Sequence, residues 1–426
     1  MTATALNLSG GDLPLPVPVT LAPSTITSPL GGSVDSFGRL RTSTPYTLFD
    51  SKQVADNQPL IWDDQQISGS GTTSTYNANQ ASTTLAVSNA TAGVRVRQTR
   101  RRFNYQPGKS HSILMTGILG GTLTGITTQL GYFDENNGVF FQQSPTGLAV
   151  CVRTNTIGSP TTSIYAQSAW NVDKMDGTGV SGITVDTTRT QIFAIDFEWL
   201  GVGIIRFGFI INGQYIPCHQ VYNANNLIVV YMSTPNLPLR YQITNSGTGG
   251  VASMKAICGT VMSEGGYSVV GQPFSLGRGT TGFATAAATT LYPVLIMRLK
   301  SGYLGHSVML RDLSILCSTA PGTFEWQLLM TPTGNATYNA LSFTSLTNSA
   351  IEFNNSADNN STLTAGTGTL LASGVSDNYL NYTFPEGQVT LGSSIAGVSD
   401  ILVLAIRSLA GTAETYYANL NWIERS

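Results

Sequence analysis

Charged side chains are scarce in this 426-residue chain. Asp, Glu, Lys and Arg together make up 10% of the sequence, whereas about 25% is usual for a globular domain. The formal net charge is -2, so there is no excess of basic residues to attract a polyanion. Nucleic acid is therefore not an expected partner, because its binding depends on clustered Lys and Arg.

Long apolar runs and targeting segments are also missing. The longest apolar run, residues 200–211, is interrupted by Arg206, and it is shorter than the roughly 18 residues that a membrane-spanning helix requires. The N-terminal residues 1–4 form neither the basic nor the apolar block of a secretory signal. We therefore expect no membrane insertion, no export by that route, and assembly in a cytoplasm.

Cysteine and histidine are few. The four cysteines lie 40 or more residues apart without a C-x-x-C pair, and the chain has three histidines. This spacing does not suit a zinc site, and we expect neither a metal nor another cofactor. The cysteines are expected to be buried free thiols, with one long-range or intersubunit disulfide as the alternative. They are Cys151, Cys218, Cys258 and Cys317.

No amphipathic helix is evident, and short alternating runs separated by Gly, Asn, Ser and Pro follow one another instead. That pattern is typical of antiparallel sandwiches, and the length exceeds one ordinary core. A Gly- and Ala-rich stretch at 263–288 indicates a junction. We predict an all-β fold with two jelly-roll-like antiparallel β-sandwich domains, residues 46–270 and 271–426, after an extended arm, residues 1–45. The predicted strands are 44–49, 92–98, 113–119, 139–143, 148–153, 191–199, 204–211, 214–221, 227–233, 239–245, 294–300, 307–317, 325–331, 401–408 and 416–424.

The arm is predicted to be extended because of its prolines. Leu13 to Pro29 contains five prolines, which fix φ and remove backbone donors, so the segment should be extended. At about 3.1 Å per residue it could span on the order of 50 Å and reach a neighbouring subunit. A loose terminus is the alternative, but the apolar residues between the prolines favour docking. They are Leu13, Leu15, Val17 and Val19.

A strand at 194–199 carries two carboxylates. Alternation places Asp196 and Glu198 on one face, and the segment resembles the E-x-D-x-E strand of laminarinase-like glycoside hydrolases, which are jelly-roll sandwiches. The resemblance covers five residues and implies that Asp196 is the assisting carboxylate and Glu198 the acid/base. Ala194 stands where that family has its nucleophile, so retaining hydrolysis is not available. We predict no catalytic residue and no enzyme.

Two non-catalytic interpretations of these carboxylates remain. One is an acidic strand face that pairs with an arginine such as Arg206. The other is a glycan-binding face made of Asp196, Glu198 and Trp199, in which the ring stacks on a sugar and the carboxylates accept hydrogen bonds from its hydroxyl groups.

About a quarter of the basic residues gather in one short segment, which is followed by Phe103 and Tyr105. Basic and aromatic residues together can bind nucleic acid. A solvated strand edge, or an intersubunit face on which guanidinium groups meet carboxylates of a neighbour, is the more common meaning. We favour the intersubunit face over nucleic-acid binding. The segment comprises Arg95, Arg97, Arg100, Arg101 and Arg102.

The block from Ser36 to Gln53, SFGRLRTSTPYTLFDSKQ, resembles an opening block of structural proteins of tailed bacteriophages and some large viruses. Residues 170–184, 197–208 and 231–266 also resemble that group. The resemblance implies a virion component that forms homotrimers, with an N-terminal segment docked on the particle through residues that include Phe37, Arg39 and Arg41.

These observations give a leading hypothesis and an alternative. The leading hypothesis is a virion structural protein of the capsid-decoration or head-fibre type, whose partners are other virion proteins. The alternative is a tail fibre or adaptor that binds host surface glycan, for which exposed aromatics such as Trp170 or Trp199 should line a groove. A polysaccharide depolymerase that uses Asp196 and Glu198 is a third, weaker hypothesis.

Overall fold

The computed structural model describes residues 44–268, 270–278, 282–285, 291–320, 322–331, 341–355, 368–385, 387, 389–410 and 412–425. The chain divides into two units after Thr44. The residues predicted to dock the arm, from Leu13 to Arg41, lie outside the described residues. Across the described ranges the secondary structure consists of strands and three short 3-10 helices. The predicted all-β class is confirmed, because antiparallel sheets form jelly-roll-like β-sandwiches.

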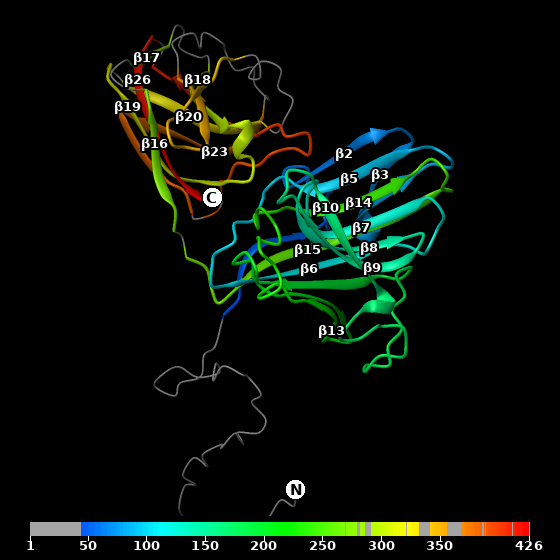
Figure 1. The fold of residues 1–426 in the computed structure, drawn as a ribbon. Coiled ribbons are helices and arrows are strands. Elements are labelled where there is room, and N and C mark those ends of the chain that lie inside the picture. Colours follow the sequence, from blue (N-terminus) through cyan, green and yellow to red (C-terminus); the bar gives the residue numbers. More distant parts are fainter. Residues whose placement is uncertain are drawn as a thin grey trace, which may run out of the picture. The chain divides into compact units, whose positions relative to one another are not determined.

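The first sandwich contains two sheets, which Figure 1 shows with their strands side by side. An eight-stranded sheet has the order β13-β12-β11-β6-β15-β4-β3, with β1 also paired to β15, and a seven-stranded sheet has the order β10-β9-β8-β7-β14-β5-β2. The strands are β1 (Tyr46–Lys52), β2 (Trp62–Gly69), β3 (Thr72–Asn77), β4 (Ser82–Val87), β5 (Gly93–Thr99), β6 (Ser110–Ile118), β7 (Ile126–Phe133), β8 (Gly138–Ser144), β9 (Gly147–Thr154), β10 (Thr161–Ala166), β11 (Gln191–Phe197), β12 (Ile205–Ile211), β13 (Gln214–Val221), β14 (Leu239–Asn245) and β15 (Ala252–Glu264), with 3-10 helices η2 (Ala78–Gln80) and η3 (Gln167–Ala169).

The core of this sandwich follows from strict alternation. In β6 every second residue is buried, beginning at His111, so one face of the strand points inward as period-two patterning requires. Its inward side chains meet Phe193 and Ile195 from β11 and, from the facing sheet, Leu130 and Phe141 in a single apolar cluster. Burial of both inner faces against each other is what holds the two sheets together.

The second sandwich is built the same way from later strands. A five-stranded sheet has the order β16-β26-β19-β24, with β17 paired to β26, and a six-stranded sheet has the order β21-β22-β18-β25-β20-β23. Its own cluster includes the buried rings of Trp326 and Trp422. The elements are β16 (Gln272–Gly277), β17 (Phe283–Ala284), β18 (Tyr292–Leu299), η4 (Ser301–Tyr303), β19 (Ser307–Cys317), β20 (Thr323–Thr331), β21 (Thr344–Ser345), β22 (Ile351–Asn354), β23 (Thr369–Asp377), β24 (Tyr379–Thr383), β25 (Ile401–Ser408) and β26 (Thr415–Arg425).

One predicted strand is wrong. Residues 227–233 form no strand and lie in a loop between β13 and β14. Leu227, Ile228 and Val229 are exposed there, so their apolar character reflects neither an inner face nor a sheet position. None of the helices among the described residues is long and apolar enough to cross a bilayer.

We expect Phe141→Ala to lower the free energy of unfolding by about 3–5 kcal/mol, because it removes a large buried ring and leaves a cavity. The ring centroid of Phe141 lies 5.1 Å from that of Phe193, 5.5 Å from Phe207 and 5.2 Å from Phe209. Chemical denaturation of the whole chain measures the change. Tyr379→Ala, at an exposed ring on β24, is the control and should change stability little; equal losses for the two variants would contradict the assignment of Phe141 to the core.

Candidate functional site

Asp196 lies on the face of the eight-stranded sheet that points away from the core. Its neighbours along β11, Ile195 and Phe197, point inward and are buried. Asp196 is paired in register with Arg206 of β12 and with Ser112 of β6, and its Oδ2 lies 3.2 Å from Nη1 of Arg206. The ion pair is the one that the acidic-face interpretation expected.

The pKa of Asp196 is raised to about 6, chiefly by burial. The positive charge of Arg206 works against this increase, whereas the negative charges of Glu264 and Glu198 add to it. A carboxyl group in this position is partly protonated near neutral pH, so it can both donate and accept hydrogen bonds.

β11 ends at Phe197, so Glu198 and Trp199 lie beyond the strand. The alternation that was expected to place Glu198 beside Asp196 therefore does not extend to Glu198. Glu198 is exposed, and its Oε1 accepts a long hydrogen bond of 3.5 Å from the backbone N–H of Ile204. Trp199 is only partly exposed: its indole N–H donates to the backbone oxygen of Met232 at 3.1 Å, and its ring packs edge-on against Tyr105.

The groove lined by tryptophan that the glycan-binding alternative required is not present among the described residues. Trp170 is 4% exposed, and its indole N–H donates to the backbone oxygen of Tyr165. Trp62, Trp326 and Trp422 are buried as well. Four of the five tryptophans therefore fill the interior, where burial of the large ring contributes most to stability.

Tyr215 supplies an exposed ring on the same sheet face as Asp196, and the sequence analysis missed it. Tyr215 is 43% exposed, and its ring lies over Gly208, where an added Cβ would come within 2.6 Å of a ring atom. Gly208 follows Arg206 by two positions on β12, so ring, guanidinium and carboxylate share one face. The strands at 204–211 and 214–221 were predicted, but their pairing was not, and this pairing places Tyr215 opposite Ile210 on the same face as Gly208.

Four of the five clustered arginines are paired within the chain. Arg95 and Arg97 both contact the carboxylate of Asp64, at 2.7 and 3.4 Å. Arg102 lies 2.5 Å from Asp134. Arg97 and Arg100 are buried and are held by carboxylates of their own chain, and the intersubunit role of the five arginines stays a prediction.

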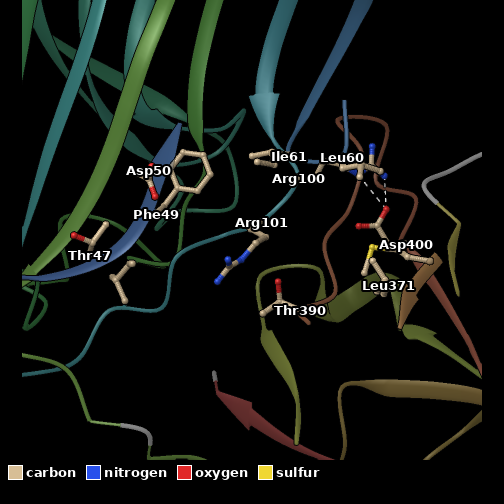
Figure 2. Close-up of a pocket in the computed structure, with 12 residues that line it drawn as sticks. Thr47, Phe49, Asp50, Leu60, Ile61, Arg100, Arg101, Leu371, Thr390 and Asp400 are labelled. Carbon is tan, nitrogen blue, oxygen red and sulfur yellow. Dashed lines mark hydrogen bonds and ion pairs between the residues drawn. The ribbon is translucent and has the colours of Figure 1, made fainter. Parts of the chain in front are cut away.

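Of the clustered arginines, Arg100 makes the contact with the greatest sequence separation. Its guanidinium pairs with Asp400, 300 positions further along the chain, and its backbone oxygen accepts from the N–H of Ser393 at 2.9 Å. Figure 2 shows this pair at one side of a pocket of about 350 Å³ that Phe49, Leu60 and Ile61 also line. In the same view Arg101 points away from the pair and is joined to none of the residues drawn.

The remaining predicted features are structural. The four cysteines form no disulfide with one another. Cys151, Cys218 and Cys317 are buried as predicted, whereas Cys258 is only partly buried. The carboxylate of Asp173 accepts from the backbone N–H groups of Met175 and Ser181, as expected for a turn. Within the ranges that the structure describes, no three His, Cys, Asp or Glu side chains form a group that could hold a metal ion.

The sequence matches no known family model and no curated protein. Solved structures similar to the fold include a Bacillus licheniformis beta-glucanase (TM-score 0.31, 10% identity, 54% of this chain and 100% of that chain). Others are a beta-1,3-glucanase from Mycobacterium marinum (0.33, 13%, 51% and 98%) and a legume lectin-like domain from Entamoeba histolytica (0.29, 10%, 52% and 98%). Because each of these TM-scores is below 0.5, the similarities do not indicate a function for this chain.

Asp196→Asn should stabilise the chain at pH 8 and change little at pH 4. The folded-state pKa of about 6 is above the ordinary value of 3.8, so the folded state holds the proton more tightly and stability is lost as pH rises from 3.8 to 6. The neutral amide avoids that loss, and we expect a gain of about 1–3 kcal/mol at pH 8. Thermal and chemical unfolding at both pH values measure it.

Asp186→Asn is the matched control. Asp186 is exposed, and hydrogen bonds from the side chain and backbone of Thr188 lower its pKa, so its amide variant should show no gain at pH 8. If Asp196→Asn were less stable than the unsubstituted chain at pH 8, the ion pair with Arg206 would outweigh the cost of burying the carboxylate.

Proposed function

We propose that this chain is a structural protein of a tailed-phage particle, of the capsid-decoration or head-fibre type, that presents its β-sandwiches on the particle surface. The sequence block from Ser36 to Gln53 supports this proposal through its resemblance to such proteins. The observation that carries it in the structure is an exposed and ordered apolar surface suited to contact with another protein.

This surface, the apolar loop patch, lies on two neighbouring loops that follow β11 and β13. Ile228 is 101% exposed, and the exposed fractions of the other four side chains lie between 42% and 59%. Exposed apolar side chains that gather on neighbouring loops are typical of a protein–protein contact site. The patch consists of Leu200, Tyr222, Leu227, Ile228 and Val229.

Hydrogen bonds between the loops hold the patch in place. The side-chain amide of Asn223 donates to the backbone oxygen of Gly203 at 2.7 Å, and the backbone N–H of Tyr231 donates to that of Gly201 at 2.9 Å. The hydroxyl of Tyr231 donates to the backbone oxygen of Glu198 at 2.9 Å. Because the loops are already ordered, a partner that binds them loses less conformational entropy.

The composition suits the same role. A surface rich in uncharged polar residues carries no strong field, so many copies can lie close together on one particle without strong mutual repulsion. In this proposal the Pro-rich segment from Leu13 to Pro29 anchors the chain, and the apolar loop patch is covered in a homotrimer or by another virion protein.

Gold-labelled antibody against the chain, viewed on intact particles by electron microscopy, tests the proposed location. We expect gold spread over the head. Gold confined to the tail or to a single vertex would contradict the head assignment and favour the fibre or adaptor alternative, and particles without gold would overturn the virion assignment.

Ile228→Asp tests the patch, because a charge at its centre is costly to bury in an interface. We expect this variant to fold but to lose self-association in analytical ultracentrifugation, or to lose incorporation into particles. Ile157→Asp, at an exposed residue in the turn between β9 and β10, is the control and should retain both. Normal self-association and normal incorporation of Ile228→Asp would contradict the proposal that the patch is a contact surface.

The second candidate function is a tail fibre or adaptor that binds host surface glycan, and the ring of Tyr215 is the observation that favours it. An exposed aromatic ring beside the carboxylate of Asp196 and the guanidinium of Arg206 offers a stacking surface together with hydrogen-bonding groups, which is what a sugar ring requires. It takes the place of the tryptophan groove that the sequence suggested.

Binding of the purified chain to host surface polysaccharide tests this candidate. Tyr215→Ala should weaken binding by about tenfold if the ring stacks on a sugar, while Tyr379→Ala, at an exposed ring of the second sandwich, should bind as the unsubstituted chain does. No binding by the unsubstituted chain, or equal binding by both variants, would remove the candidate.

A further inference from the structure

Arg101 is the member of the arginine segment that has no carboxylate partner in the described part of the chain. Its neighbours Arg100 and Arg102 pair with Asp400 and Asp134. Arg101 instead lines both the pocket of Figure 2 and an adjoining pocket of about 160 Å³. Because guanidinium stays charged at any ordinary pH, its position brings a full positive charge to these pockets.

A second arginine lines the smaller pocket. Arg425, near the end of β26, is 4% exposed. Its Nη1 donates to the hydroxyl of Tyr267, and its guanidinium carbon lies 5.0 Å from the centre of that ring. Its Nε and Nη2 are buried and have no hydrogen-bond partner among the described residues. Buried donors without an acceptor are costly, and those on a charged group are more costly still.

Among the residues that the structure describes, no carboxylate forms an ion pair with either guanidinium. Burial lowers the pKa of Arg101, and the charge of Arg425 lowers it further, while the polar groups that act in the opposite direction are the phenols of Tyr267 and Tyr46. Glu424, next to Arg425 in the chain, is directed elsewhere, since its carboxylate accepts from Ser349, Ala350 and Trp422. Two like charges therefore share a small polar pocket.

We propose that this pocket binds a small oxyanion, a carboxylate or a phosphate, between the guanidinium groups of Arg101 and Arg425. Guanidinium presents paired donors that match the oxygens of these anions, and both Arg101 and Arg425 line this pocket. Ser307 lines the same pocket and adds a hydroxyl. The stacked rings of Tyr46 and Tyr267, with centroids 5.2 Å apart, form a wall against which the carbon frame of an organic acid could pack.

The bound anion would also join two distant parts of the chain. Arg101 follows β5 of the first sandwich, and Arg425 lies on β26 of the second. An anion that accepts from both converts a repulsive pair into two attractive ones, so binding should stabilise the folded chain by mass action. The inference is independent of the proposed function, since it concerns neither the apolar loop patch nor the face around Asp196.

Isothermal titration calorimetry and thermal unfolding of the full chain test the site, with inorganic phosphate and glucuronate as probes and chloride at equal ionic strength as the reference. We expect one anion per chain and a rise in the unfolding temperature with at least one probe. Binding of phosphate alone would identify a phosphate site, and binding of glucuronate would identify a carboxylate site. No binding of either probe overturns the proposal.

Arg101→Gln and Arg425→Gln should each weaken binding by about tenfold to a hundredfold, the loss expected for charged hydrogen bonds. Arg189→Gln, at an exposed arginine whose Nε lies 3.7 Å from Asp186, is the control and should bind normally. Unchanged binding in the two pocket variants would show an adventitious ion only and contradict the site.

A stability measurement without anion separates this role from a purely structural one. Arg101→Gln removes one of two facing like charges, so the variant should be as stable as the unsubstituted chain or more stable in chloride, and should gain nothing from the anion. Arg101→Gln that is destabilised in chloride, yet stabilised by the anion as much as the unsubstituted chain, would overturn the proposal. If Arg425→Gln fails to fold, Arg425→Lys, which keeps the charge and loses the paired donors, should bind more weakly.

Discussion

Burial of guanidinium groups is the constraint on which much of this structure depends. Residues 95–102 include the end of β5 and the residues that follow it, and two of their arginines, Arg97 and Arg100, are buried away from water. A buried charge without a carboxylate partner costs several kcal/mol, and four of the five arginines in this segment have such a partner. In a chain with so few acidic residues, the positions of Asp64, Asp134 and Asp400 are therefore tied to the course of this one segment.

The contact of Arg100 with Asp400 has the widest consequence. It joins residues from the two sandwiches, and a second carboxylate, Asp63, lies 3.9 Å from the same guanidinium. Oδ2 of Asp63 in turn accepts the backbone N–H of Ile395 at 2.7 Å. A buried network of this kind fixes geometry more than it adds net stability, and it places Arg101, the next residue, beside the pockets that it lines.

The apolar interior and the candidate surfaces are separated by strand alternation. On β11 the residues that face the core are Phe193, Ile195 and Phe197, whereas Asp196 faces outward next to Arg206. The apolar loop patch begins directly after this strand, and its loops bond to the backbone of Glu198 and Gly203. One rigid strand thus supports both an outward polar face and an apolar contact surface, which is how β scaffolds commonly position functional loops.

The sequence by itself determined the all-β class and many of the strands. The alternation of apolar and polar residues in segments such as Ser110–Ile118 predicts a strand with one buried face, and Gly- and Asn-rich segments between them predict the turns. That the four cysteines form no disulfide with one another was the prediction favoured by their spacing. These properties are local, because they depend on periodicity and composition over a few residues.

Only the tertiary structure decided which side chains meet. The partner of Arg100 lies 300 positions away, and the pairing of β11 with β12 places Asp196 beside Arg206 on the face that also carries the ring of Tyr215. The apolar run at 227–229 was predicted as strand because its composition is that of a strand, and it is a loop because the hydrogen bonds of Asn223 and Tyr231 hold it outside the sheet. Register, pairing and exposure arise from packing between distant segments, and that is the information a one-dimensional pattern does not contain.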